Sequence, residues 1–362
     1  MRDEPVYLVT DQGAATGTGA YVAALMDLLG KTYPNLTVLS LCYLPGQEQP
    51  GWKRLPHSRV ARSLHEIPLV IRHNRLLFQK TIPHDSRIHF CGASYTSVPA
   101  YTRSIVTVHD YYPRWPSFLS LGNARMLLRD VAALKQYVQL PRQSRYARAR
   151  VVPTHYVQEC LYHGCSLPSI VIHHWTEASK FFPRDKRSAR ASLGLPLNQR
   201  LVLNVSTGTS NKNYPQLANI ASDLSEGYQL VIGGGHGSLG EIKGTFLPRL
   251  ADEVYPLLFN ACDAYLHLST QEGFGRPLIQ AMASGLPIVA LRTAVAKEVL
   301  GDAAIWVGPD EPVSRWVESL ESAAEGASRD DLIARGGKRA LLFDPESARR
   351  AYTELYQEVF GL

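Results

Sequence analysis

Short apolar runs alternate with longer amphipathic stretches along most of this chain, and this alternation constrains the fold more than any other feature. The strand-like runs Val6–Thr10 and Leu36–Tyr43 flank a helical stretch, Ala20–Leu29, in which leucines recur on one face. The same order returns between residues 201 and 291. Alternation of this kind predicts parallel sheets covered by helices, which is the α/β class.

The domain organisation follows from length and local composition. A chain of 362 residues exceeds the usual size of one hydrophobic core, so we expect two domains. Residues 183–200 are charged, turn-prone and weakly apolar, which is typical of a linker or boundary. We therefore expect a first α/β domain over residues 1–180 and a second over residues 185–340. The last stretch, residues 345–362, has helical spacing, and we expect it to cross back to the first domain.

The charge of the chain differs between its halves. The formal net charge of +6 combines 20 Lys and Arg against 11 Asp and Glu in residues 1–180 with 18 against 21 in the remainder. Basic residues gather in a polar stretch of helical spacing between residues 120 and 148. A basic half suits an anionic partner, such as a lipid-phosphate acceptor or a membrane surface, or it is simply solvated, and both interpretations stay open. Nucleic acid is disfavoured, because no aromatic platform or reading motif accompanies the charge.

Cysteine usage and hydropathy indicate the compartment. The five cysteines form no Cys-x-x-Cys pair, which favours a reducing compartment such as the cytoplasm. Cys160 and Cys165, with His155 and His163 nearby, lack the spacing of a structural zinc site, so we expect no metal there. No apolar stretch reaches the roughly 20 residues that span a bilayer, and no signal peptide is expected. The prediction is a cytoplasmic protein, with peripheral contact to a membrane surface left open.

The segment from Ser269 to Ala290 concentrates the residues that are suited to holding a ligand. A buried strand is expected to end at Ser269, and a turn containing Gly273 and Gly275 then leads into a helix with Pro277 in its first turn. The glycines let the backbone approach a ligand closely. Ligands of open α/β sheets bind at the carboxyl ends of strands, so this turn is a candidate binding site.

The start of that helix favours an anionic ligand. The amides of Phe274, Gly275 and Arg276 would lie at a positive helix terminus, which suits a diphosphate. Glu272 precedes the turn, and Gln280 lies about one helical turn inside the helix. Both side chains are expected to reach hydroxyl groups of one extended ligand.

The run Glu272-Gly-Phe-Gly-Arg-Pro277, followed by Ala281-Met-Ala-Ser-Gly-Leu-Pro287, resembles the E-x7-E motif region of the group 1 (family 4) retaining glycosyltransferases. The resemblance is strong over about residues 200–310 and includes the segments 205–213, 257–266 and 298–304. It is fainter in the first half, at residues 107–110, 152–154 and 171–174.

This resemblance implies the GT-B fold, in which two doubly wound Rossmann-like domains face each other across a cleft. It also implies a hexosyltransferase that moves a hexose, with retained anomeric configuration, from a nucleotide-sugar such as GDP-mannose or a UDP-sugar. The acceptor would be a saccharide or a lipid-linked molecule held mainly by the first domain. No cofactor and no metal are implied, because a cationic side chain takes the role of a divalent metal.

The family's site residues carry over to matching positions of this chain. Glu272 would contact the transferred sugar, Lys212 would neutralise the leaving diphosphate, and His109 would line the cleft near the sugar. The donor-binding positions would be Gly17, Gly19, Phe274, Gly275, Arg276 and Gln280. A purely structural role stays open for three of the site residues. Gly17 and Gly19 are then turn glycines, and His109 is a hydrogen-bonded histidine at the end of a strand.

Three departures from the family pattern open an alternative. Gln280 stands where the motif has its second glutamate, and an amide is uncharged and can also donate a hydrogen bond. The arginine that usually precedes the lysine is missing from residues 206–211, and Arg276, which replaces a small or apolar residue, is a candidate to compensate for it. The alternative is a catalytically silent GT-B relative that acts as a binding or scaffold module. Another GT-B enzyme, a phosphorylase or a nucleotide-sugar epimerase, is a further rival.

Overall fold

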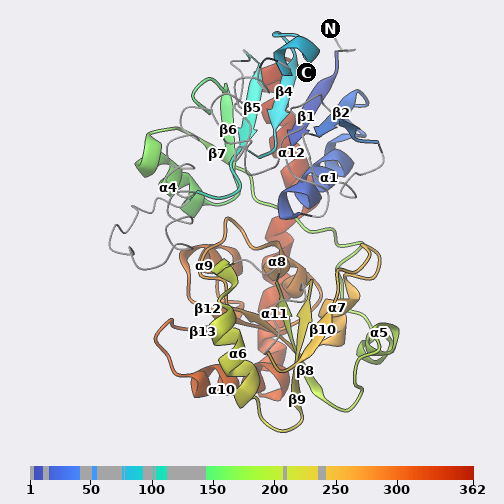
Figure 1. Ribbon diagram of the computed structural model, residues 1–362, viewed down its shortest axis with the longest axis vertical. Helices are drawn as coiled ribbons and strands as arrows, with labels where there is room; N and C mark the ends of the chain where they lie inside the picture. The colour runs from blue at the N-terminus through green and yellow to red at the C-terminus, as the bar shows by residue number, and fades with distance from the viewer. Residues whose placement is uncertain are drawn as a thin grey trace. The chain divides into compact units, whose positions relative to one another are not determined.

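The computed structural model divides the chain into two compact units (Figure 1). Unit 1 comprises residues 1–173 and 348–362, and unit 2 comprises residues 174–347. The residues that the structure describes are 4–10, 16–40, 51–54, 76, 78–92, 101, 103–111, 144–206, 210–234 and 242–362. The predicted basic helix lies outside them as far as residue 143, as do residues 11–15 of the first loop and residues 207–209.

Unit 1 is a parallel sheet with helices packed on it. Within its described residues, seven strands pair in the order β3-β2-β1-β4-β5-β6-β7, and every pair is parallel. The strands are β1 (Val6–Thr10), β2 (Leu36–Ser40), β3 (Lys53–Arg54), β4 (Arg87–Phe90), β5 (Ser104–Thr107), β6 (Ala149–Val152) and β7 (Ile170–Val171). Parallel neighbours cannot be joined by a tight hairpin, so this sheet agrees with the predicted alternation of strands and helices.

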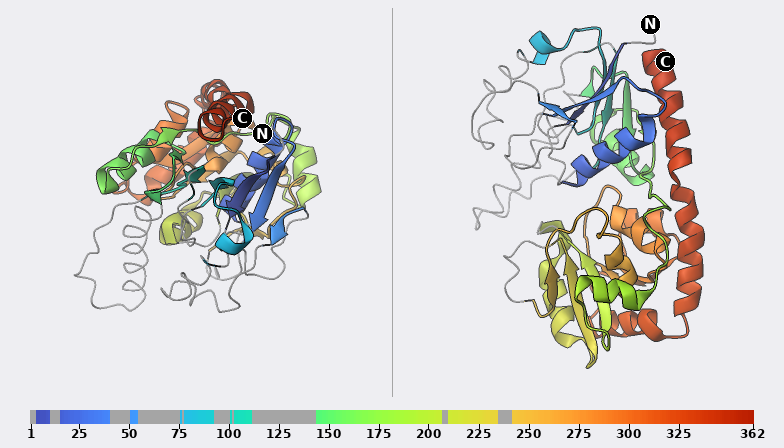
Figure 2. Two further views of the ribbon diagram at one scale, coloured as in Figure 1. Left: turned by 90° about the horizontal axis from the view of Figure 1, so that it is seen from above. Right: turned by 90° about the vertical axis from the view of Figure 1, so that its right-hand side faces the viewer.

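Three described helices pack in unit 1: α1 (Gly17–Leu29), α4 (His155–Cys165) and α12 (Pro345–Phe360). Threonine caps begin the first two, since Thr16 accepts from Gly19 N–H at 3.0 Å and Thr154 accepts from Val157 N–H at 3.2 Å. From residue 348 onward α12 belongs to unit 1, and in both views of Figure 2 its C-terminal part lies beside the sheet. Buried tyrosines on this face, such as Tyr352, hold it there.

Unit 2 repeats the architecture. In its described part six parallel strands pair in the order β10-β9-β8-β11-β12-β13. The strands are β8 (Arg200–Val205), β9 (Tyr228–Gly233), β10 (Thr245–Leu247), β11 (Ala264–His267), β12 (Ile288–Leu291) and β13 (Ala304–Val307). The helices are α5 (Lys186–Leu193), α6 (Tyr214–Asp223), α7 (Leu257–Ala261), α8 (Arg276–Ala283), α9 (Ala294–Leu300), α10 (Val313–Glu325) and α11 (Arg329–Ala340). The α/β prediction is therefore confirmed in both units.

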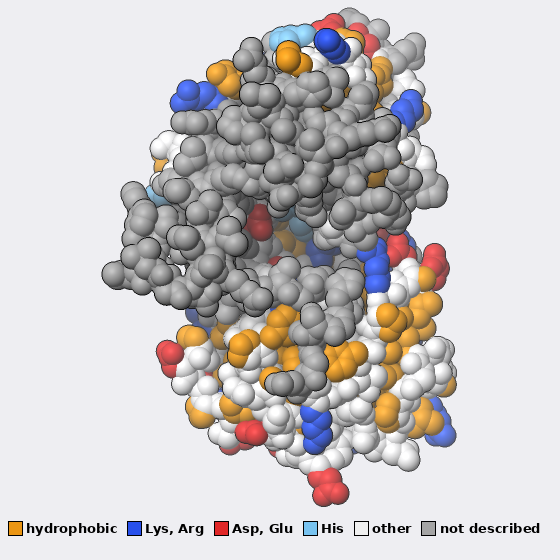
Figure 3. Space-filling view, in the orientation of Figure 1, with side chains coloured by type: hydrophobic (Ala, Val, Ile, Leu, Met, Phe, Trp, Pro, Cys, Tyr) orange, Lys and Arg blue, Asp and Glu red, His pale blue; other side chains and the backbone are white. Residues whose placement is uncertain are grey.

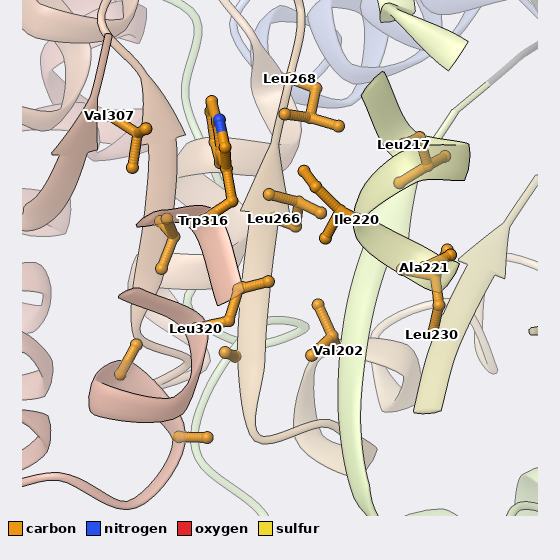
Figure 4. Packing of buried hydrophobic residues seen from close by; sticks show 14 of the residues in the cluster. Val202, Leu217, Ile220, Ala221, Leu230, Leu266, Leu268, Val307, Trp316 and Leu320 are labelled. Atoms are coloured by element: carbon orange, nitrogen blue, oxygen red, sulfur yellow. The ribbon is translucent and has the colours of Figure 1, made fainter. Parts of the chain in front are cut away.

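The core of unit 2 joins the central strands to the helices beside them (Figure 4). Val202 of β8 and Leu266 of β11 are fully buried against Ile220 of α6. Trp316 and Leu320 of α10 cover the other end of the cluster. Burying these apolar side chains, at about 1.5–3 kcal/mol each for the aliphatic ones, fixes the order of β8 and β11 and thus the loops that follow them.

The prediction of a linker over residues 183–200 was wrong. This segment forms α5, and Arg190 on it is 4% exposed. Its guanidinium contacts Asp263, with Nη2 and Oδ2 at 2.6 Å, and Nε donates to the Ala261 carbonyl at 2.8 Å. A charged residue of the segment that was predicted to be a solvated linker thus forms an ion pair and a hydrogen bond inside unit 2. The division between the units falls earlier than the expected boundary, at His173 and His174.

Charged groups are mixed with apolar ones on the described surface of unit 2. Figure 3 shows Asp and Glu, in red, and Lys and Arg, in blue, scattered among apolar side chains on the visible face of this unit, at the bottom of the view. This mixture agrees with the near balance of Lys and Arg against Asp and Glu in the second half of the chain. Over the described ranges, no helix has both the length and the apolar composition needed to cross a membrane.

Candidate functional site

The candidate site of unit 2 lies where the strand order of its sheet reverses. Strand β8 pairs with β9 on one side and with β11 on the other, so the connections after β8 and β11 leave the same edge in opposite directions. Such a switch point opens a crevice at the carboxyl ends of the strands. The first connection carries a short 3-10 helix, η2 (Ser210–Lys212), and the second runs through Glu272 into α8.

Lys212 and Glu272 meet at this edge. The Lys212 ammonium donates a short hydrogen bond to Glu272 Oε1 and forms an ion pair with it, although 60 positions separate the two residues. The side chains are 17% and 19% exposed, so the pair is largely shielded yet within reach of a solute. The structure therefore brings together the two unit 2 residues that were expected to serve the transferred sugar and its leaving group.

Asn211 fastens the two loops to each other. Its side-chain amide donates to the Gln271 carbonyl at 2.8 Å, and its own carbonyl accepts from Thr270 N–H at 2.9 Å. These bonds hold the residue before Lys212 against the residue before Glu272. This role of Asn211 was not predicted, because an asparagine in a loop carries no signal of the strand pairing that brings its partner near.

The electrostatics around Glu272 favour its ionised form. Burial, the largest single influence, would raise the pKa of this carboxyl, but the Lys212 ammonium, His267 and hydrogen bonds from Lys212 and Ser269 together outweigh it, and the net pKa is lowered. His267, the last residue of β11, is 4% exposed, and burial lowers its pKa to about 4. This imidazole is therefore neutral at pH 7. His267 was not among the predicted site residues, although a histidine at the end of an apolar strand is a feature that the sequence shows.

The start of α8 is shaped by a glycine. Gly275 caps the helix with φ at +84°, in the left-handed region. A Cβ there would lie 3.0 Å from Leu278 Cδ1, so a side chain would be strained by the backbone conformation and would also press on the Leu278 side chain. The Phe274 ring is buried against His174 and Phe343, with centroid distances of 5.0 and 5.5 Å. Its side chain therefore serves packing, and only its backbone remains for a ligand.

Gln280 is 7% exposed and held by a tyrosine. The Tyr255 hydroxyl donates to Gln280 Oε1 at 3.1 Å, which fixes the orientation of the amide. Burial raises the pKa of Tyr255 and the nearby Arg276 guanidinium opposes this, so the phenol stays protonated and Arg276 lies within electrostatic reach of it. The predicted partners Gln280 and Arg276 thus share a neighbour, Tyr255, that sequence analysis did not single out.

The remaining predicted residues, Gly17, Gly19 and His109, lie in unit 1. Gly17 opens α1 with space around it, while Gly19 is buried with its amide engaged by Thr16. His109 is half-buried two residues beyond the end of β5. Its ring lies edge-on to the Tyr21 ring of α1, with centroids 4.6 Å apart.

A buried polar network extends from Tyr21. Its hydroxyl contacts the hydroxyls of Tyr352 on α12 and Thr107 on β5. The fully buried His89 bonds Thr107 Oγ1 at 2.7 Å and the Tyr356 hydroxyl at 2.8 Å. Burial lowers the pKa of His89 to about 3, so the ring stays neutral. This network joins α1, β4, β5 and α12.

Comparison with known families concerns unit 2. Residues 185–339 match the family described as "Glycosyl transferases group 1". This range lies inside unit 2 and contains η2, β11 and α8.

Among curated proteins, the chain is similar to the D-inositol 3-phosphate glycosyltransferases of Mycobacterium tuberculosis and Mycobacterium bovis. The identity is 27% over 224 residues, which cover 55% of this chain and 46% of the relative. The chain thus spans about half the length of the curated relatives it matches.

Solved structures share the fold over nearly the whole chain. Sucrose-phosphate synthase from Thermosynechococcus elongatus superposes with a TM-score of 0.74 at 19% identity, covering 99% of both chains. HepE from Anabaena, in complex with UDP and glucose, gives 0.72 at 18% identity and covers 98% of this chain and 100% of that one. WaaG, a glycosyltransferase involved in lipopolysaccharide biosynthesis, gives 0.73 at 14% identity over 97% of this chain and 99% of its own.

These matches agree with the two parallel sheets and with the motif at the start of α8. Residues 185–339 are therefore a group 1 glycosyl transferase domain, carried by a chain with the GT-B fold.

Proposed function

We propose that this protein is a retaining glycosyltransferase that moves a hexose from a nucleotide-diphosphate sugar to a saccharide or lipid-linked acceptor. The observation that carries the proposal is the juxtaposition of Lys212 and Glu272 at the switch point of the unit 2 sheet. A cation and a carboxylate at that edge suit the two halves of a sugar diphosphate.

In the proposed reaction the bond between the sugar anomeric carbon and the β-phosphate oxygen breaks, and a bond from that carbon to an acceptor oxygen forms. The acceptor loses a proton, and the nucleoside diphosphate leaves with the bonding electrons. Lys212 opposes the charge that accumulates on the leaving diphosphate, without recourse to a divalent metal. The backbone at Phe274 and Gly275 approaches the phosphate, and Glu272 accepts a hydrogen bond from a sugar hydroxyl.

The remaining predicted residues fill supporting roles in this proposal. Gln280, oriented by Tyr255, contacts the nucleoside, and Arg276 adds positive charge at the helix start. His109 lies near the sugar, and Gly17 and Gly19 border the donor at the start of α1, where a Cβ at Gly17 would meet no described atom within 4 Å.

The names of the relatives guide the choice of substrates. HepE was solved with UDP-glucose, so UDP-glucose heads the donor panel, with GDP-mannose as the alternative. The Mycobacterium relatives are named for transfer involving D-inositol 3-phosphate, so a phosphorylated polyol joins saccharides and lipid-linked sugars as acceptors. The basic composition of the first half supports an anionic acceptor or contact with a membrane surface.

The test is release of nucleoside diphosphate from this donor panel, with and without acceptors, followed by proton NMR of the product. We expect one donor to be used and the product to keep its anomeric configuration. An inverted product would refute the retaining mechanism. Tight donor binding without transfer to any acceptor would favour the silent relative, which the replacement of a glutamate by Gln280 motivates.

A further inference from the structure

We propose that the Lys212–Glu272 pair is a partner-exchange device: without a ligand each residue neutralises the other, and an arriving nucleoside diphosphate takes Lys212 and releases Glu272 to the sugar. The proposal rests on the function proposed above and goes further, because it assigns a state to the site before the donor binds.

The contact between the two side chains is the first observation. The Lys212 ammonium bonds directly to Glu272 Oε1, and the side chains are only 17% and 19% exposed. In this arrangement the positive charge that a diphosphate needs is already cancelled by a carboxylate. A diphosphate that bound beside the intact pair would meet little net charge and would also be repelled by Glu272.

The second observation is that the backbone segments that carry Lys212 and Glu272 are hydrogen-bonded to each other. Asn211 ties the η2 segment to residues 270 and 271 through backbone and side-chain hydrogen bonds. The backbones therefore stay in place while the side chains change partners. The lysine side chain is flexible and presents a point charge, so it can turn from one oxygen to another without a movement of the loops.

Two further titratable groups among the described residues lie near the pair, His267 and Tyr265. Burial keeps the His267 imidazole uncharged at neutral pH and raises the pKa of the Tyr265 phenol, so neither brings a charge that competes for Lys212. A doubly charged diphosphate offers Lys212 more charge than one carboxylate does, so exchange is favoured once the ligand arrives. Glu272 then carries a full negative charge without its cation, which strengthens the hydrogen bond that it accepts from a sugar hydroxyl.

The experiment measures binding of UDP, GDP and ADP, and of UDP-glucose, by calorimetry on the full chain. Glu272→Gln keeps the size of the side chain and removes its charge, so Lys212 becomes available before the ligand arrives. We expect the nucleoside diphosphate that binds wild type to bind this variant about tenfold more tightly, while sugar transfer falls. A carboxylate that served only as a sugar contact would leave binding of the sugar-free diphosphate unchanged.

A double-mutant cycle separates exchange from simple repulsion. In a Lys212→Met background the Glu272→Gln change should improve binding by less than it does in wild type, because it relieves only the repulsion by Glu272 and there is no ammonium to release. An equal gain in both backgrounds would mean that Glu272 merely repels the ligand, and it would overturn the proposal. Glu318→Gln, on α10 and 65% exposed, removes the same charge elsewhere in unit 2 and should leave binding unchanged.

The outcomes distinguish this inference from the proposed function. Binding in wild type with no gain in Glu272→Gln or in Glu272→Ala, both folded by thermal melting, overturns the exchange and leaves the transferase proposal standing. Failure of every form to bind any of the four nucleotides overturns the proposed function, and the exchange with it.

Discussion

Two carboxylates of unit 2, Asp263 and Glu272, form ion pairs at opposite edges of the same two strands, and their surroundings differ. At the amino edge of β8 and β11, Asp263 is 1% exposed and accepts from Arg190 at 2.6 Å, Lys186 at 2.5 Å and Leu201 N–H at 2.7 Å. At the carboxyl edge, Glu272 is 19% exposed and pairs with Lys212. The first carboxylate is saturated by partners of its own chain, and the second keeps access to a solute.

The contrast separates charges that are saturated within the fold from the pair that serves a ligand in the proposed function. Asp263 has two cations and an amide fixed around it, and Arg190 is further bonded to the carbonyls of Ala261, Leu197 and Gln199. No ligand could replace so many contacts at once. Lys212 is a single flexible cation, so one incoming anion can replace its contact with Glu272. Four substitutions test this contrast.

The largest effect is expected for Lys212→Met. Without the ammonium the leaving diphosphate loses the cation that opposes its charge most directly, so transfer should fall about 10²–10³-fold. Because the pair is partly exposed, the free energy of unfolding should change by about 1 kcal/mol or less. Initial rates of nucleoside diphosphate release measure the first quantity and urea denaturation the second. If Lys212→Met keeps a tenth of the wild-type rate or more, the cation that serves the diphosphate lies elsewhere. Lys212→Arg keeps a positive charge, so its transfer rate should fall less than that of Lys212→Met.

Asp263→Asn should show the opposite profile. Removing this charge leaves Arg190 buried without its counter-ion and should destabilise the protein by about 3 kcal/mol. Nucleotide binding by the folded protein should stay at the wild-type level, which isothermal calorimetry can check. Glu325→Gln removes an exposed carboxylate that pairs with Arg200, and its urea midpoint should match wild type. An unchanged midpoint for Asp263→Asn as well would remove the distinction between the two edges.

The pH dependence of stability should reveal His267. Its pKa is about 4 in the folded protein against 6.5 for a free histidine, so between these values the unfolded chain binds more protons than the folded one. Stability therefore rises with pH across this window, by about 2–3 kcal/mol between pH 4.5 and 7. The lowered pKa of Glu272 leaves its pair with Lys212 present throughout that range, because this contribution is lost only as pH falls through the folded value.

His267→Gln isolates that contribution, because the buried His89 remains as a common background with its own pKa of about 3. The difference between unfolding free energies at pH 7 and pH 4.5 should shrink by about 2–3 kcal/mol in the variant. Equal differences in variant and wild type would show that His267 is not kept neutral by burial.

The smallest effect is expected for Gly275→Ala. The left-handed backbone and the close approach to Leu278 should cost about 1–2 kcal/mol of stability and weaken diphosphate binding. Gly337→Ala is the matched control, since a Cβ there meets nothing within 4 Å on α11, and it should stabilise by about 0.5–1 kcal/mol. Loss of stability in both variants alike would argue against a special role for the turn at Gly275.

Much of the fold was predictable from local pattern. The strand Val6–Thr10 was predicted with the bounds that the structure has, and the helical stretch predicted at residues 345–362 forms α12, which ends two residues earlier at Phe360. Apolar period and helix punctuation are local properties. The error over residues 186–193 has the same origin. A charged helix and a charged linker have similar composition, and only the position of Asp263, some 70 residues later, tells them apart.

The site was predicted less completely than the fold. Glu272, Gly275 and Lys212 were found through the motif, while Asn211, Tyr255 and His267 were not. Each of the missed residues acts through a partner on another strand or helix, as Asn211 does through Gln271 and Tyr255 through Gln280. Such pairings have no short-range signature in one sequence.

The sequence by itself determined the class of fold, the parallel strands and the glycine-marked turn before α8, because periodicity and backbone conformation depend on neighbouring residues. Only the tertiary structure decided that Lys212 touches Glu272 and that Asp263 is saturated. Those facts follow from the order of strands in a sheet, which hydrophobic packing selects over the whole domain. The two edges of β8 and β11 therefore acquire different chemistry from residues far apart in the chain.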